Sequence, residues 1–105
     1  MIFVESPWFE AWRRRHFDDA AFQRLQLALL ADPLFGDLIP ASGGLRKLRL
    51  ALPGRGKRGG ARLIYYYSAD VDRIYLLYAY AKNVQSDLTK EQVRQLAAAM
   101  RKEFE

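Results

Sequence analysis

Cysteine is missing from this sequence of 105 residues, and histidine occurs once, as His16. Disulfide bonds, thiol nucleophiles and thiolate zinc sites are therefore excluded, as is a metal site built from several histidines. Histidine is also the most frequent acid–base residue of enzymes. His16 follows three arginines near the end of a predicted helix, and we interpret it as a solvated residue. Any catalysis must therefore depend on other residue types.

Long apolar runs are missing as well. No segment reaches the ~18 consecutive apolar residues of a membrane helix, and Met1–Ser6 lacks the basic start and apolar run of a secretory signal. We expect a cytoplasmic protein without membrane contact. Half of the residues are hydrophobic, which is enough for one core of ordinary size. Residues 1–105 are therefore predicted to form a single domain.

Acidic residues are absent between Asp37 and Asp70, whereas seven basic residues lie there. These bases are Arg46, Lys47, Arg49, Arg55, Lys57, Arg58 and Arg62. The ten remaining bases are outnumbered by the twelve acids, so this segment accounts for the whole net charge of +5. Charge that is gathered in one segment, rather than spread over the surface, is typical of a site for a polyanion.

The same segment is expected to form a β-hairpin. Leu45–Leu52 alternates apolar and basic residues, which predicts a strand with one packed and one wet face. Pro53–Gly60 is a loop of glycine and basic residues. Ala61–Tyr67 and Arg73–Tyr80 have apolar residues at both odd and even positions, which is typical of strands in the centre of a sheet. Ile2–Val4 is predicted to be a first, short strand.

Two helices are predicted between the first strand and the hairpin. Ser6 before a proline is an N-cap signal, which places a helix over Pro7–His16. A second helix begins at Asp18 or Asp19 and ends at Asp32, because the proline that follows disfavours helical angles. The aromatic residues expected on the buried side of the first helix are Trp8, Phe9, Trp12 and Phe17.

A loop is expected at Leu34–Ser42, and the chain ends in a third helix, for which Thr89 and Gln92 fit a capping box. Its apolar stripe is Val93, Leu96, Ala97, Met100 and Phe104. The order β-α-α-β-β-β-α predicts an α+β fold with a small, mostly antiparallel sheet. Three helices cover only part of such a sheet, so some of the six tyrosines are expected to line a groove on an open face.

The basic residues could support RNA cleavage without a metal. That reaction needs a base for the 2′-hydroxyl, cations for the in-line phosphorane and an acid for the 5′-oxygen. Lys57, Arg58, Arg62 and Lys82 have tyrosines nearby, and clustered cations lower the pKa of a neighbouring lysine or tyrosine. A protein that only binds single-stranded RNA uses the same residue types, so residue types alone do not separate a nuclease from a binding module.

Three ordered parts of the chain resemble the RelE/HigB family of bacterial type II toxins, and most closely its HigB branch. They are Gly43–Arg49, Gly56–Tyr66, and Tyr75–Asn83 with Ser86–Leu88. The resemblance covers most of the chain and implies a microbial-RNase-like fold. It also implies cleavage of mRNA in the A site of the 70S ribosome and neutralisation by a cognate helix-turn-helix antitoxin (HigA-like). Operator DNA would be contacted only through that antitoxin, and no cofactor or metal is implied.

The resemblance assigns roles to several basic residues. Arg62 matches the arginine that stabilises the phosphate, Lys57 and Arg58 match the basic residues that precede it, and Lys82 lies where many members have a catalytic cation. Many RelE members also have a tyrosine shortly after that cation, whereas Val84–Thr89 contains none.

The general base therefore stays open among Lys57, Lys82 and Tyr80. The residues expected to attract the RNA backbone are Arg46, Lys47, Arg49, Arg55 and Arg58. We predict a toxin that is a ribosome-dependent, metal-independent endoribonuclease. The alternatives are a ParE-like gyrase poison and a non-catalytic RNA-binding module.

Overall fold

The computed structural model of the protein describes residues 1–52 and 60–103. Phe104 and most of the predicted loop tip, with Arg55, Lys57 and Arg58, lie outside these described residues. The helices are α1 (Pro7–His16), α2 (Asp19–Ala31) and α3 (Lys90–Glu103). The strands are β1 (Ile2–Glu5), β2 (Asp37–Leu38), β3 (Arg46–Leu50), β4 (Ala61–Ser68) and β5 (Arg73–Ala81).

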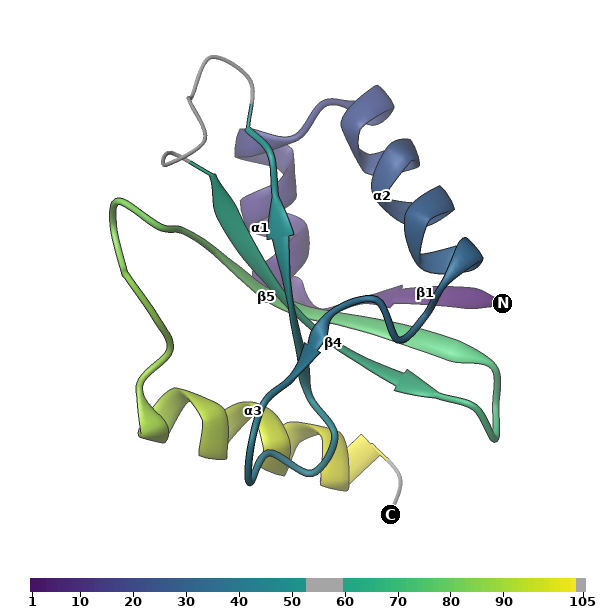
Figure 1. Cartoon of the computed structure of the whole chain (residues 1–105), viewed down its shortest axis with the longest axis vertical. Helices are drawn as coiled ribbons and strands as arrows, with labels where there is room; N and C mark the ends of the chain where they lie inside the picture. Colours follow the sequence, from purple (N-terminus) through teal and green to yellow (C-terminus); the bar gives the residue numbers. More distant parts are fainter. Residues whose placement is uncertain (53–59, 104–105) are drawn as a thin grey trace.

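The strands form one mixed sheet in the order β1-β5-β4-β3-β2. β1 pairs in parallel with β5, and the other pairings are antiparallel. The sheet separates two layers of helices, because α1 and α2 lie on one side of it and α3 on the other (Figure 1). The prediction of an α+β fold with a mostly antiparallel sheet is therefore confirmed.

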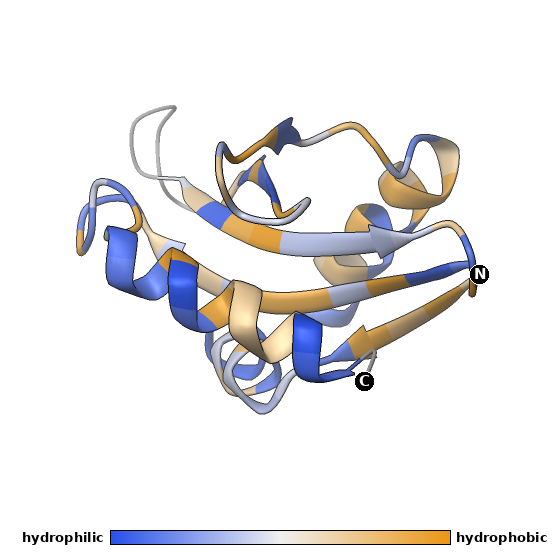
Figure 2. Cartoon of the chain, turned by 90° about the horizontal axis from the view of Figure 1, so that it is seen from below, coloured by the Kyte–Doolittle hydropathy of each residue, from blue (hydrophilic) through white to orange (hydrophobic). Residues whose placement is uncertain are grey.

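Each side of the sheet has its own apolar core. On one side, Phe9 of α1 and Leu29 of α2 pack in a cluster with Tyr65 of β4. On the other side, Leu96 of α3 packs in a cluster with Ile64 of β4. Figure 2 shows hydrophilic and hydrophobic residues alternating along α3, as expected for a helix that covers a sheet with one face.

Side-chain caps begin the helices where the sequence predicts. The Ser6 hydroxyl accepts a hydrogen bond from the backbone N–H of Phe9 at 3.1 Å, and the Asp18 carboxylate caps α2 in the same way at 2.7 Å. Thr89 and Gln92 form the reciprocal capping box, with distances of 3.0 and 3.1 Å. In the part of the chain that the structure describes, no helix is both long and apolar enough to cross a membrane.

Helices pack on both sides of the sheet, so less of it is open than the expected tyrosine-lined groove requires. Tyr65, Tyr75 and Tyr80 are buried, and the other three tyrosines are half-buried. Trp8, expected on the buried side of α1, is instead 59% exposed and lines a small hollow with Tyr78. The helix places Phe9 rather than Trp8 toward the sheet, because only one face of so short a helix reaches the core.

The structure also adds a strand that the sequence analysis did not expect. Asp37–Leu38, inside the predicted loop Leu34–Ser42, pairs with Lys47 and Arg46 of β3 and forms the sheet edge. A two-residue strand has too few positions to show alternation. Its presence depends on the neighbouring strand, which supplies the partners for its backbone groups.

The turn before β2 is held by a buried tyrosine. The Tyr65 hydroxyl donates to the carbonyl of Pro33 at 2.9 Å and accepts from the N–H of Gly36 at 2.8 Å. Arg46 donates to the carbonyl oxygens of Leu34 and Gly36 at 3.3 and 2.8 Å. The backbone of this turn is therefore bound on two sides.

Replacement of Tyr65 by phenylalanine is expected to lower the free energy of unfolding by about 1–3 kcal/mol. The variant leaves the N–H of Gly36 and the carbonyl of Pro33 without their buried partner. Urea unfolding followed by circular dichroism measures the change. Tyr67→Phe on the same strand is the control, expected within about 0.5 kcal/mol of wild type because its hydroxyl has no hydrogen bond to another described residue. Equal stability of the two variants would contradict the role of the Tyr65 hydroxyl.

Candidate functional site

A hollow of about 530 Å³ lies between the turn before β2, strands β3 and β4, and the segment after β5. We call it the basic hollow. It is lined by Phe35, Gly36, Asp37, Lys47, Leu48, Arg49, Arg62, Lys82, Ser86 and Asp87. Four of these residues are cationic and two are acidic, so the hollow combines anion-binding groups with carboxylates.

Two arginines of the basic hollow are direct cross-strand neighbours. Arg49 of β3 pairs with Arg62 of β4, and Arg62 pairs in turn with Tyr80 of β5. Like charges directly opposite each other on a sheet repel and cost stability. An anion bound between the two guanidinium groups would relieve this repulsion, and the planar fork of donors suits a phosphate. Alternation along β3 and β4 therefore places two cationic side chains next to each other in the basic hollow.

Asp87 contributes an ionised carboxylate. Its Oδ1 accepts hydrogen bonds from the backbone N–H of Leu88 at 2.8 Å and from Lys47 Nζ at 3.2 Å. These donors, the Leu88 N–H first, hold the pKa of Asp87 below the ordinary carboxyl range. The side chain of Asp87 is 64% exposed, so a substrate can reach it.

Tyr80 lies beneath Asp87 and is almost completely buried. Its hydroxyl is 3.5 Å from Asp87 Oδ1, a long donor contact. Burial, with the negative charge of Asp87, raises the pKa of Tyr80 to about 12, and Arg62 opposes this only in part. The expectation that nearby cations lower the pKa of this tyrosine is therefore wrong, because desolvation outweighs them. A buried, neutral phenol supports the Asp87 carboxylate better than it exchanges protons with a substrate.

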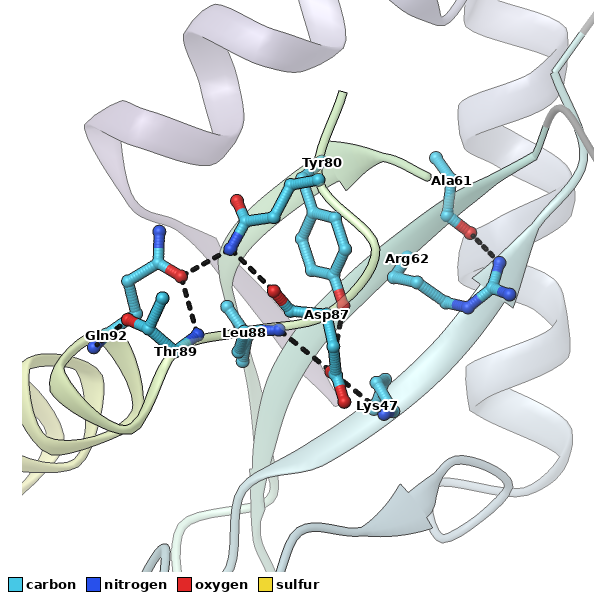
Figure 3. A network of polar contacts seen from close by, with 9 residues as sticks. Lys47, Ala61, Arg62, Tyr80, Asp87, Leu88, Thr89 and Gln92 are labelled. Carbon is cyan, nitrogen blue, oxygen red and sulfur yellow. Dashed lines mark hydrogen bonds and ion pairs between the residues drawn. The ribbon is translucent and has the colours of Figure 1, made fainter. Parts of the chain in front are cut away.

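Polar contacts attach the loop that carries Asp87 to the start of α3 (Figure 3). The Gln85 amide donates to the carbonyl of Asp87 at 2.8 Å and to Gln92 Oε1 at 2.5 Å. Gln92 Oε1 also accepts the N–H of Thr89 in the capping box. The same helix cap that the sequence predicts thus fixes the position of the carboxylate.

The structure brings together four of the predicted site residues. Arg62, Lys82, Lys47 and Arg49 all line the basic hollow. In Figure 3 the Arg62 side chain extends toward Ala61, and its guanidinium donates a hydrogen bond to the carbonyl of Ala61 at 3.0 Å. Lys47 lies beside Asp87, with which it forms an ion pair.

Arg46 is not part of this group, since its guanidinium binds the carbonyl oxygens of the turn before β2. Arg55, Lys57 and Arg58 were predicted as site residues and lie outside the described residues. Asp87 and Phe35 were missed. Asp87 had a signal, because it is the one acidic residue between Asp72 and Glu91.

Within residues 1–52 and 60–103, no three or more histidine, cysteine, aspartate or glutamate side chains gather closely enough to hold a metal ion.

Comparison with known proteins gives a match to a family model and matches to solved structures. Residues 2–104 match the family model described as the RelE toxin of the RelE / RelB toxin-antitoxin system. A solved structure of E. coli toxin RelE, a double arginine-to-alanine mutant in the free state, superimposes with a TM-score of 0.58 at 12% identity. The superposition covers 94% of this chain and 95% of that chain, and at this identity it shows a shared fold.

Proposed function

We propose that this chain, which belongs to the RelE toxin family, is a ribosome-dependent endoribonuclease that cleaves mRNA and so inhibits translation. The observation that supports this most is the composition of the basic hollow. It combines the cross-strand pair Arg49 and Arg62 with the ionised, exposed carboxylate of Asp87. A carboxylate repels a bound phosphate, so its place beside the two arginines suits proton transfer better than phosphate binding.

The proposed reaction divides the chemistry among four side chains. Asp87 accepts the proton of the 2′-hydroxyl, and the 2′-oxygen then attacks the adjacent phosphorus in line with the leaving 5′-oxygen. Arg62 and Arg49 stabilise the charge that develops on the phosphorane oxygens. The bond from phosphorus to the 5′-oxygen breaks, and Lys82 gives a proton to that oxygen. The products are a 2′,3′-cyclic phosphate and a free 5′-hydroxyl, with no metal needed to balance the reaction.

The ribosome has a physical role in this proposal. A carboxylate whose pKa lies well below 7 is a weak base, so proton removal by Asp87 is inefficient unless the substrate is held in line. Holding the reacting atoms in a near-attack geometry can supply ~7–11 kcal/mol of the barrier. We therefore propose that mRNA fixed in the ribosomal A site is the substrate and that free RNA is cut poorly.

We further propose that the chain is cytoplasmic and that a cognate antitoxin neutralises it. The resemblance to the HigB branch points to a helix-turn-helix, HigA-like partner, through which alone the pair would contact operator DNA. The cations of the basic hollow would attract an acidic segment of such a partner. Sequencing the neighbouring reading frame tests this proposal.

The function is tested with the purified chain, ribosomes and a defined mRNA, by mapping new 5′ ends with primer extension. Cleavage that requires ribosomes supports the proposal. Intact mRNA together with DNA breaks in the presence of gyrase would select a ParE-like poison. RNA affinity that falls steeply with salt, without any cleaved product, would select a binding module.

The single-turnover cleavage rate is expected to change by less than about twofold between pH ~6 and ~8. Asp87 has a lowered pKa, so it loses its proton-accepting form only when the pH falls below the ordinary carboxyl range. Tyr80 stays protonated until the pH rises toward about 12. Quenched-flow cleavage on programmed ribosomes measures the profile. A rate that rises about tenfold per pH unit would instead assign proton removal to a lysine such as Lys82 or Lys57.

A further inference from the structure

A large aromatic side chain stands at the rim of the basic hollow without a role in the proposed chemistry. Phe35 is 63% exposed, although a phenylalanine normally avoids water. It lines the hollow together with Arg49, Arg62 and Lys82. An exposed ring beside phosphate-binding cations is the combination by which proteins bind single-stranded RNA.

The backbone that carries Phe35 is fixed on both sides. Tyr65 binds the carbonyl of Pro33 and the N–H of Gly36, and Arg46 binds the carbonyl of Gly36. Gly36 is buried, and a Cβ there would lie 2.8 Å from the Tyr65 ring, so the turn packs without spare room. The ring is therefore presented outward by a turn that has already lost its conformational freedom, which lowers the entropy cost of binding.

We propose that Phe35 is the stacking platform for a nucleobase next to the phosphate held by Arg49 and Arg62. This inference rests on the proposed function and adds a base-binding subsite to it. Exposed Leu34 and Leu38 beside Phe35 could instead form an apolar patch for a protein partner. RNA is favoured because Phe35 lines the basic hollow, whereas neither leucine does.

Two measurements test the subsite. The first is kcat/KM for cleavage of mRNA on programmed ribosomes, and the second is affinity for a hexaribonucleotide in the absence of ribosomes. Phe35→Ala is expected to lower both about tenfold, whereas Phe35→Trp, which keeps a π-face, stays within about twofold. Phe35→Leu keeps the apolar bulk but not the ring face, and it is expected to behave like Phe35→Ala. Leu34→Ala in the same turn is the matched control and should leave both values unchanged.

An abasic nucleotide identifies the base that stacks. The nucleotides around the cleavage site are replaced one at a time by an abasic nucleotide. At one position this replacement should lower kcat/KM of the wild-type chain about tenfold, and it should not lower kcat/KM of Phe35→Ala any further. Wild-type values for Phe35→Ala or Phe35→Leu would overturn the subsite. So would a Phe35→Ala variant that cleaves normally but is no longer neutralised by the antitoxin, which would assign the ring to a protein interface.

The two proposals fail in different ways. A wild-type chain that never cleaves mRNA contradicts the proposed function, and the hexaribonucleotide affinities of wild type and Phe35→Ala still decide the subsite. Because Phe35 is mostly exposed, its variants should melt within a few degrees of wild type, which circular dichroism checks.

Discussion

Arg62→Ala is expected to reduce ribosome-dependent mRNA cleavage about 1,000-fold. Arg62 occupies the middle of the cross-strand row, opposite Arg49 on one side and Tyr80 on the other. Arg62 lies on β4, the middle strand of the sheet, and lines the basic hollow in which the phosphorane would be held. Loss of one donor that stabilises the transition state typically lowers the rate of the chemical step about 10²- to 10³-fold. The variant also loses the repulsion between the two arginines, which favours binding of an anion between them. Single-turnover cleavage and growth arrest after induction both measure the effect.

Two further variants separate charge from geometry. Arg62→Lys keeps the charge but not the planar fork, so we expect a loss of about 10- to 100-fold. Arg24→Ala removes the same charge from an exposed position on α2, outside the basic hollow, and is expected to cleave like wild type. If Arg62→Ala combined with Lys82→Ala stayed folded and fully growth-inhibitory, the basic hollow would not be the active site.

Asp87→Asn is expected to lower the cleavage rate about 100-fold or more. The amide is nearly isosteric and can still accept the hydrogen bond from Leu88, so the loop should keep its place. It cannot take a proton from the 2′-hydroxyl, and it loses the ion pair with Lys47. Because the change removes a negative charge from an anion site, RNA affinity should hold or rise while the rate of the chemical step falls. Rate and affinity measured separately show this split.

The matched control is Asp37→Asn, which removes a carboxylate from the same hollow. The Lys47 ammonium and the Tyr80 hydroxyl bind the Asp87 carboxylate rather than that of Asp37, so we expect the cleavage rate of Asp37→Asn to change less than about threefold. A larger loss for Asp37→Asn than for Asp87→Asn would move the role of general base to Asp37. Equal, small losses for both variants would assign the role of general base to a lysine, and the cleavage rate would then rise with pH.

Local signals in the sequence predicted much of the fold. The caps at Ser6, Asp18 and Thr89 begin the helices where expected, because a cap depends on residues within one turn. The strands also follow local patterns, and the fold is shared with the solved structure of E. coli RelE.

Local signals failed where a partner distant in the sequence decides the outcome. β2 exists because β3 supplies its hydrogen-bond partners, and Trp8 is exposed because the sheet accepts only one face of α1. The register between β4 and β5 shifts after Ile64, so Leu77 of β5 has no partner residue in β4. As a result, Leu77, Tyr78 and Tyr80 all face the α3 side of the sheet. No periodicity in the sequence marks such a bulge.

The same division applies to the site. The charge pattern along the chain was enough to locate a cationic hairpin with Arg62, Lys47 and Arg49, because alternation along a strand assigns each residue to a face. Lys82 lies after β5, outside this hairpin, and was selected because tyrosines are nearby and because of the family resemblance. Which of these cations share a hollow, and that Asp87 joins them from a loop after β5, depends on contacts between segments far apart in the sequence. The pKa of Tyr80 depends on them too, since burial and a neighbouring carboxylate are properties of the folded chain and not of any stretch of it.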